Sequence, residues 1–333
     1  MIHGKLKELG YQLNLYGKLR ATHGRYSPER DMAAAPFPLV IQLQTINACQ
    51  AACVMCPYPV FKDRFPRGRM DDALFDKITD EIAQHDVDTF VPMLQNEPFL
   101  DKHIFEKIRR FKDRTGGRVA VELVTNGAFL TDENVAKIRA AELDVLDISL
   151  DAISPEVYRR IRIGLDYDAV MAGVERVLQA DLPQTDVFVR LVRQKENVHE
   201  VRAFVRKWRR RGVPVFIYTA NNRVGAVEDY EKLVRIPEAE VPITQKLLRR
   251  FFRMWMGCCP IPFASTNILH NGDVLMCVHD WARREIVGNV REASIAEIWN
   301  GGRMRELRAA IHRRRYEESP ACRDCSLWKD GWF

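Results

Sequence analysis

Short apolar runs alternate with longer amphipathic stretches from residue 39 to residue 219. The short runs are rich in Val, Ile, Leu and Phe, which is typical of β-strands. They predict six strands, at residues 39–44, 89–95, 119–125, 145–150, 186–192 and 213–219. The stretches between them repeat apolar residues with a helical period. They predict helices at residues 71–85, 103–114, 132–142, 154–161, 167–180 and 199–211.

Strict alternation of strand and helix predicts a parallel sheet with right-handed crossovers, in an α/β fold. Both an open doubly wound sheet and a partial barrel satisfy this pattern. The alternation stops after residue 219, where a linker leads to a helix predicted at 243–256. Beyond it, Asn271-Gly272 predicts the turn of a β-hairpin, and two further helices are predicted on either side of Gly301-Gly302. We therefore expect three parts: an N-terminal helical extension (1–36), the α/β region (37–240) and a C-terminal region (241–333).

Composition narrows the functional classes. The chain of 333 residues is 47% hydrophobic, yet it has no apolar run long enough to span a bilayer and no secretory signal at its N-terminus. We expect a cytoplasmic protein, whose eight cysteines serve metal binding or catalysis more readily than disulfides. The net charge of +6 resides partly in Arg-rich runs at 206–211 and 312–316. We interpret these runs as solvated surface or, alternatively, as a surface that attracts an anionic substrate or partner. The sequence resembles no nucleic-acid-binding module.

Three cysteines cluster directly after the first predicted strand. Cys49, Cys53 and Cys56 form a C-x3-C-x2-C pattern on the strand's C-terminal loop, where α/β proteins place their active sites. Thiolates bind iron–sulfur clusters or zinc, and three ligands are one short of a closed tetrahedral site. Neither His85 nor His103 pairs closely with the triplet. A zinc site and unrelated core cysteines remain alternatives.

The triplet, with Met55 before its third cysteine, resembles the radical S-adenosylmethionine (radical SAM) superfamily. The resemblance implies a partial (β/α)6 TIM-like barrel in which the three cysteines bind a [4Fe-4S] cluster. S-adenosylmethionine would occupy the fourth iron position through its amino and carboxylate groups. One electron from a flavodoxin- or ferredoxin-type donor would cleave it to a 5′-deoxyadenosyl radical, which removes a hydrogen atom from the substrate.

Three further motifs end the second, third and fourth predicted strands: QNEP at 95–98, TNG at 125–127 and SLD at 149–151. In the family a GGEP-like motif contacts the methionine amino group, although this chain has Gln95-Asn96 in place of the two glycines. The resemblance implies that the cofactor is bound by Met55, Gln95, Asn96, Glu97, Thr125, Asn126, Ser149, Asp151 and Arg162. Met55 would lie against adenine, and Arg162 would pair with the carboxylate. Each residue taken alone is also ordinary turn or packing material.

The C-terminal cysteines resemble a SPASM/Twitch extension over residues 257–328. That implies one auxiliary [4Fe-4S] cluster with ligands Cys277, Cys322, Cys325 and one of the neighbours Cys258 and Cys259. Cys259 is preferred, and a zinc ribbon is the alternative. Cys258 is then left over, either as a buried thiol or as a catalytic hydrogen-atom donor to the substrate.

These features predict a radical SAM oxidoreductase or epimerase. We expect dehydrogenation or epimerisation of a carbohydrate-like or aminocyclitol small molecule in natural-product biosynthesis. The 36 residues before the first strand are few for a leader-binding module, and a single auxiliary cluster resembles the aminocyclitol dehydrogenase subgroup. The alternative is a maturase that modifies a ribosomal peptide or protein. A non-enzymatic iron–sulfur electron carrier or a zinc protein would not require six β-α units with these strand ends.

Overall fold

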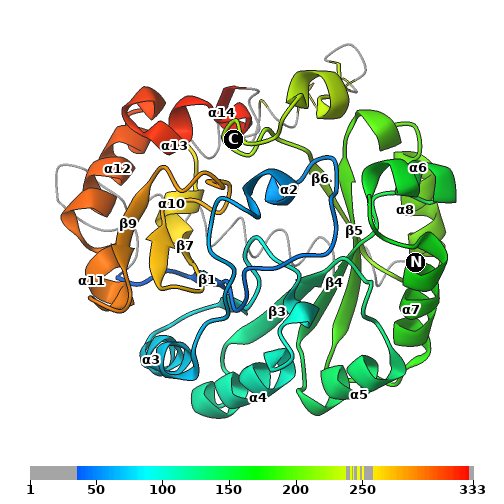
Figure 1. Ribbon diagram of the computed structural model, residues 1–333, viewed down its shortest axis with the longest axis horizontal. Coiled ribbons are helices and arrows are strands. Elements are labelled where there is room, and N and C mark those ends of the chain that lie inside the picture. The colour runs from blue at the N-terminus through cyan, green and yellow to red at the C-terminus, as the bar shows by residue number, and fades with distance from the viewer. Residues whose placement is uncertain are drawn as a thin grey trace.

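A computed structural model describes residues 36–237, residues 241, 243, 246, 247 and 250, and residues 258–329. The predicted N-terminal helical extension and most of the predicted helix at 243–256 lie outside the described residues. The described strands form one nine-stranded sheet in the order β6-β5-β4-β3-β2-β1-β7-β8-β9 (Figure 1).

All six predicted strands are present, and each is parallel to its neighbours. They are β1 (Val40–Leu43), β2 (Thr89–Val91), β3 (Ala120–Thr125), β4 (Val145–Ser149), β5 (Asp186–Arg193) and β6 (Val215–Thr219). Their order in the sheet follows their order in the sequence, whereas a doubly wound sheet reverses direction at a switch point. The consecutive order therefore identifies a partial barrel, and the predicted fold class is confirmed.

The predicted helices also form, and they lie around the outside of the parallel strands (Figure 1). They are α3 (Asp72–Ala83), α4 (Ile104–Thr115), α5 (Asp132–Ala140), α6 (Pro155–Ile161), α7 (Tyr167–Gln179) and α8 (Val201–Arg210). Four of them begin after a side chain that accepts a hydrogen bond from a backbone N–H of the first turn, namely Asp71, Thr131, Ser154 and Asp166. These caps satisfy N–H groups that otherwise lack a helical partner.

The two faces of the parallel sheet differ in chemistry. Side chains that point toward the helices, such as Leu123, Ile148 and Leu191, are fully buried in one large apolar core. The alternate positions of the same strands point into the barrel and include Asp147 and Arg190. The outer face therefore holds the fold together, and the inner face carries polar side chains.

The predicted hairpin extends the barrel sheet. β7 (Ser265–Ile268) is parallel to β1, and β8 (Asp273–Leu275) and β9 (Ile286–Asn289) follow as antiparallel strands. Gly272 adopts φ 97° in the turn, which confirms the Asn271-Gly272 prediction. The two predicted helices around Gly301 are α11 (Ile295–Trp299) and α12 (Gly302–His312). The boundary predicted at residue 240 remains a prediction.

Short elements complete the described part of the chain. They are α2 (Tyr58–Phe61), η2 (Pro98–Leu100), η3 (Lys195–Asn197), η4 (Tyr230–Val234), α10 (Ile261–Ala264), η6 (Tyr316–Glu318), α13 (Pro320–Arg323) and α14 (Ser326–Lys329). Among the residues that the structure describes, every helix is too short or too polar to cross a membrane.

Candidate active site

The three-cysteine loop joins β1 to α2 at the C-terminal edge of the parallel strands. Backbone hydrogen bonds from Ala52 to Ile163 (2.8 Å) and from Val54 to Ile161 (3.0 Å) hold the loop against the end of α6. Cys53 is buried, and Cys49 and Cys56 are partly exposed. Burial, with a smaller contribution from the neighbouring thiols, raises the pKa of Cys49 to about 12 and that of Cys56 to about 11. Such thiols ionise only when a metal replaces their protons.

Arg162 and Asp151 lie beside this loop, and their predicted contact with the cofactor stays a prediction. Arg162 donates from Nη1 to the sulfur of Cys53 (3.6 Å), and its Nη2 lies 2.6 Å from Oδ2 of Asp151. Both side chains of this ion pair are buried. The Nε atom of Arg162 is buried and has no hydrogen-bond partner among the described residues. One donor of the guanidinium therefore remains available to a ligand next to the triplet.

Glu97 connects three of the predicted motifs. Its carboxylate accepts hydrogen bonds from Oγ1 of Thr125 (2.7 Å) and from the N–H of Asn126 (2.9 Å). Its own N–H donates to the carbonyl of Ala48, just before the triplet (2.9 Å). Burial raises the pKa of Glu97 to about 7. Since both carboxylate oxygens contact protein donors, Glu97 positions the end of β3; its contact with a methionine amino group stays a prediction.

Gln95 and Asn96 occupy the positions where the family resemblance expects glycines. Gln95 adopts φ 58°, in the left-handed region that glycine favours, so the backbone keeps a glycine-like conformation. Its side chain donates to the carbonyls of Val278 (3.2 Å) and Asp280 (3.4 Å), and thereby joins the motif to the C-terminal part of the chain. Nδ2 of Asn96 is buried without a partner among the described residues.

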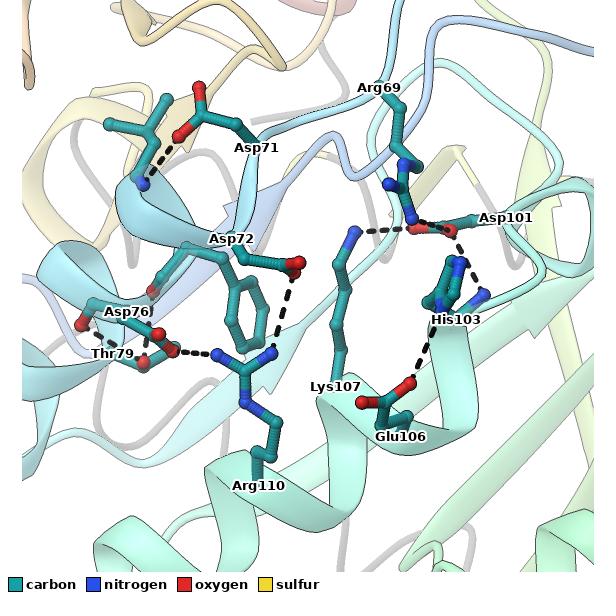
Figure 2. Close-up of polar contacts among 12 residues, drawn as sticks. Arg69, Asp71, Asp72, Asp76, Thr79, Asp101, His103, Glu106, Lys107 and Arg110 are labelled. Carbon is teal, nitrogen blue, oxygen red and sulfur yellow. Dashed lines mark hydrogen bonds and ion pairs between the residues drawn. The ribbon is translucent and has the colours of Figure 1, made fainter.

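A buried ion pair stabilises the segment that follows the QNEP motif. Lys107 of α4 lies 2.7 Å from Asp101, and both side chains are at most 1% exposed. Figure 2 shows the side chains of Lys107 and Arg69 both turned toward Asp101. Asp101 directly follows η2, the short helix that begins at the last residue of the QNEP motif. Because removal of one partner would leave a buried charge uncompensated, this pair fixes η2 on α4.

Met55 and Ser149 are buried at the same edge of the barrel. The amide of Gln194 lies 3.9 Å from the sulfur of Met55, and Oε1 of Gln194 is buried without a partner among the described residues. Sequence reasoning missed Gln194. It follows the fifth strand just as the other motifs follow strands two to four, so its position was the available signal.

The unpartnered buried atoms provide a test of whether S-adenosylmethionine fits this edge. Asn96 and Arg162 each offer a nitrogen donor, and Gln194 offers an oxygen acceptor. A ligand that carries an amino group, a carboxylate and hydroxyls supplies partners for donors and acceptors of both kinds. The three thiols beside these atoms are the donor set of an iron–sulfur cluster. The residues present therefore fit both groups.

Four cysteines line a second cavity, in the C-terminal part. Cys259, Cys277, Cys322 and Cys325 surround it together with apolar side chains such as Ile261 and Met276. Burial raises the pKa of Cys259 and Cys277 well above the usual range. Cys258 is 1% exposed, packs in the adjoining apolar cluster and is not part of this lining. This placement favours Cys259 over Cys258 as the fourth ligand.

The four C-terminal cysteines line a cavity and are not gathered at one point. Among the described residues, no three Cys, His, Asp or Glu side chains are gathered closely enough to hold one metal ion. A zinc ion requires thiolates about 2.3 Å from a single centre. A four-iron cluster binds each thiolate through a different iron and does not require that convergence.

Charged side chains gather on the inner face of the barrel, a feature that sequence reasoning did not find. Arg190 donates from Nε to Asp147 (2.8 Å), and its Nη2 lies 3.5 Å from Glu122. Its guanidinium stacks 4.6 Å from the ring centre of Tyr218. Burial raises the pKa of Asp147 to about 6, and Arg190 opposes that rise. The signal was present in the sequence as charged residues inside otherwise apolar strands.

Arg223 lies between the two cysteine sites. It interacts electrostatically with Cys56 of the first site, with Cys277 of the second and with Arg190 of the inner face. Its Nη1 lies 2.5 Å from Nδ1 of His279. Burial and the Arg223 charge hold the pKa of His279 well below its usual range, so its neutral ring accepts this hydrogen bond. Arg223 thus lies within electrostatic range of both sets of thiols and of Arg190.

Comparison with known families agrees with this geometry. The family described as the radical SAM superfamily matches residues 43–207, and the family described as an iron-sulfur cluster-binding domain, SPASM, matches residues 258–326. The first match contains the triplet and all three strand-end motifs. The second contains all five C-terminal cysteines.

Individual relatives differ in what they are named for. A GTP 3′,8-cyclase from Limosilactobacillus fermentum is 32% identical over 136 residues, which is 40% of this chain and 40% of the cyclase. The chain thus spans less than half the length of that relative. An S-adenosyl-L-methionine-dependent 2-deoxy-scyllo-inosamine dehydrogenase from Niallia circulans is 20% identical over 289 residues, which is 86% of this chain and 92% of the dehydrogenase.

Solved structures share the fold. BtrN in complex with AdoMet and 2-DOIA superposes with a TM-score of 0.61 at 18% identity, covering 86% of this chain and 92% of BtrN. Streptococcus suis SuiB bound to its precursor peptide SuiA superposes with a TM-score of 0.65 at 13% identity, covering 87% of this chain and 71% of SuiB.

Proposed function

Because this chain belongs to the radical SAM superfamily and carries a C-terminal SPASM iron–sulfur domain, we propose that it dehydrogenates a small polyol, of carbohydrate or aminocyclitol type. The enzyme uses S-adenosylmethionine with one [4Fe-4S] cluster and an auxiliary cluster. Beyond membership of the superfamily, we propose the class of substrate, the outcome of the reaction and the residues responsible for each.

Cys49, Cys53 and Cys56 would hold the first cluster, and Cys259, Cys277, Cys322 and Cys325 the auxiliary one. When bound, these groups supply one-electron chemistry and a radical that removes a hydrogen atom from carbon. The protein positions them: Glu97 fixes the ends of two motifs, and Asp151 orients Arg162 beside Cys53. The free Nε of Arg162 suits the methionine carboxylate, and Gln194 suits a ribose or adenine donor.

The balance of charge on the inner face is the observation that carries the substrate class. Arg190 and Arg223 contribute two positive charges, and Glu122 and Asp147 contribute two negative charges, which leaves no net charge among these four. A nucleoside triphosphate requires several unopposed cations, as phosphate sites do. A neutral or singly aminated polyol meets paired donors and acceptors here. The inner face therefore favours a polyol, of the kind that the dehydrogenase relative is named for, over a nucleoside triphosphate, which the cyclase relative is named for.

The auxiliary site supports dehydrogenation as the outcome. Its cavity is lined by four thiols and apolar side chains, so a cluster there has no iron position left for substrate. A cluster without an open coordination position is suited to accept an electron from a substrate radical. With loss of the hydroxyl proton, that electron transfer converts an alcohol into a ketone.

Peptide modification is the second candidate. Its support is the superposition on SuiB with bound SuiA, whose TM-score of 0.65 is at least as high as that of BtrN at 0.61. Epimerisation would require a hydrogen-atom donor, and Cys258 was predicted for that role. Its burial outside the four-cysteine cavity gives the role no support, so it remains a prediction.

The test is anaerobic turnover of the reconstituted enzyme with S-adenosylmethionine, dithionite and one of three probes. The probes are 2-deoxy-scyllo-inosamine, GTP and a synthetic cysteine-containing peptide. We expect 5′-deoxyadenosine and a product that lacks two hydrogen atoms with the aminocyclitol alone. A product of unchanged composition that gains one deuterium in heavy water would indicate epimerisation. Turnover of the peptide or of GTP, without turnover of the aminocyclitol, would contradict the proposed substrate class.

A further inference from the structure

A basic loop follows the three-cysteine site. Residues 62–69, KDRFPRGR, hold four basic side chains and one acidic side chain, a net charge of +3. Lys62, Arg64 and Arg67 are exposed. Arg69 is turned toward Asp101 instead (Figure 2), at 3.9 Å. No step proposed above uses these three exposed cations.

The loop is attached to the cluster ligands through its aromatic residues. Phe61 is buried in a small apolar cluster, and Phe65, Cys49 and Cys56 all pack against that cluster. Arg283 lies 3.7 Å from the ring centre of Phe65 and fixes it from the C-terminal part of the chain. Cys49 and Cys56 are also the two partly exposed thiols of the triplet. The exposed cations therefore belong to a loop whose aromatic residues pack in the same cluster as the two partly exposed thiols.

The site needs an electron from outside, because S-adenosylmethionine cleavage is reductive. We propose that Lys62, Arg64 and Arg67 form the docking surface for an acidic one-electron carrier of the flavodoxin type. The carrier is oxidised by one electron and the cluster next to Cys49 and Cys56 is reduced by one. This proposal rests on the cluster assignment made above and does not depend on the substrate class.

Charge complementarity is what commits the surface to this partner. Opposite charges on the exposed surfaces of two proteins accelerate their association and orient them, and salt weakens this effect. Protein electron transfer also requires the two redox centres to approach closely. A basic surface that adjoins the thiolates satisfies both requirements. Helix α8 carries comparable charge on its exposed face, but it packs against β5 and β6 on the outside of the barrel (Figure 1).

A charge-reversal pair tests the proposal on the anaerobic holoenzyme. The test variant combines Lys62→Glu, Arg64→Glu and Arg67→Glu. The matched control combines Arg202→Glu, Arg206→Glu and Arg210→Glu on α8, where the three arginines are equally exposed. Formation of 5′-deoxyadenosine is measured at low salt with reduced flavodoxin and, separately, with dithionite.

We expect the loop variant to lose at least about tenfold in the flavodoxin-driven rate, within the range known for electrostatic steering. Its dithionite-driven rate and iron content should equal those of the wild type, and the α8 variant should keep both rates. A wild-type flavodoxin-driven rate in the loop variant, or equal slowing in the α8 variant, would overturn the proposal.

Two further measurements cover the remaining outcomes. If the triple variant loads less iron, Arg64→Glu and Arg67→Glu are measured singly, together with the salt dependence of the wild-type rate; a rate independent of salt would overturn the proposal. Calorimetric binding of flavodoxin to the holoenzyme tests the surface even if the wild type fails to cleave S-adenosylmethionine with dithionite. That failure would contradict the cluster assignment, whereas weaker flavodoxin binding by the loop variant would still support the docking surface.

Discussion

The two cysteine sites differ in number of thiols and in what surrounds them. The first has three thiols, bordered by the charged side chains of Arg162, Asp151 and Glu97 and by buried polar atoms without partners. The second has four thiols in a cavity whose other walls are almost entirely apolar. A cluster with three protein ligands needs a polar ligand to complete it, and polar groups are present there. A cluster with four needs none, and apolar walls suffice.

The contrast separates two tasks within one enzyme. An open coordination position with polar neighbours is typical of a catalytic metal site, and a closed one of a structural or electron-transfer site. Arg223 interacts electrostatically with a thiol of each site and with Arg190. A substrate held on the inner face would therefore have radical chemistry on one side and an electron acceptor on the other.

Removal of one thiol from the three-thiol site, which we call the open site, should have the largest effect. Cys53→Ala should reduce 5′-deoxyadenosine formation to the detection limit, because two thiolates do not retain the cluster. Iron content should fall from about eight to about four per chain, since the closed site keeps its cluster. Continued cleavage of S-adenosylmethionine by this variant would sink the assignment.

The neighbouring residues Cys258 and Cys259 test the assignment of the four-thiol site, which we call the closed site. Cys259→Ala should lose the auxiliary cluster, about half of the iron, and with it ketone formation. Cys258→Ala should keep both clusters and lose on the order of 1 kcal/mol of stability from the cavity it leaves. Iron analysis and thermal unfolding measure both effects. Loss of iron from the Cys258 variant alone would exchange the two assignments, and loss only of inverted product would restore its role as hydrogen-atom donor.

Glu97→Gln probes the polar border of the open site. The substitution keeps the size of the side chain but removes the charge that Thr125 and Asn126 contact. We expect S-adenosylmethionine to bind about tenfold more weakly, in line with the loss of one hydrogen bond to a charged group. Iron content should be unchanged, and Glu156→Gln on the exposed side of α6 is the matched control. Equal affinities by calorimetry would show that this border does not position the cofactor.

The smallest expected effect concerns Arg162 and Asp151. Hydrogen bonds and positive charge near cluster sulfurs raise a reduction potential. Arg162→Met should therefore lower the potential of the first cluster, and Asp151→Asn should raise it by leaving the Arg162 charge unopposed. Each shift should be within a tenfold change in the reduced-to-oxidised ratio, about 59 mV for one electron. Redox titration followed by electron paramagnetic resonance measures both, and shifts of the same sign would refute the explanation.

Much of the fold followed from periodicity and turn chemistry. The six strands, the outer helices and the Asn271-Gly272 hairpin each depend on residues close together in sequence. The parallel pairing of β7 with β1 joins segments more than two hundred residues apart, and no local pattern encodes it. The sequence thus predicted the elements of the barrel but not the way in which the C-terminal part extends its sheet.

The candidate site was predictable where residue type alone indicates chemistry. The cysteines were identified in this way, whereas the strand-end motifs were identified through the resemblance to the radical SAM superfamily. The direction of a side chain was not predictable: Glu97 turns toward Thr125 and Asn126, and Gln95 reaches Val278. The pairing of Asp147 with Arg190 depends on the register of β4 and β5, which fixes which side chains share the inner face.

Electron paramagnetic resonance of single-cluster variants tests the central contrast most directly. The dithionite-reduced Cys277→Ala variant retains only the three-thiol site, and the Cys53→Ala variant retains only the four-thiol site. Addition of S-adenosylmethionine labelled with 17O and 15N should shift the spectrum of the first variant and produce hyperfine coupling to both nuclei, while the second should remain unchanged. Coupling in the Cys53→Ala variant, or none in the Cys277→Ala variant, would contradict the assignment of the open and closed sites.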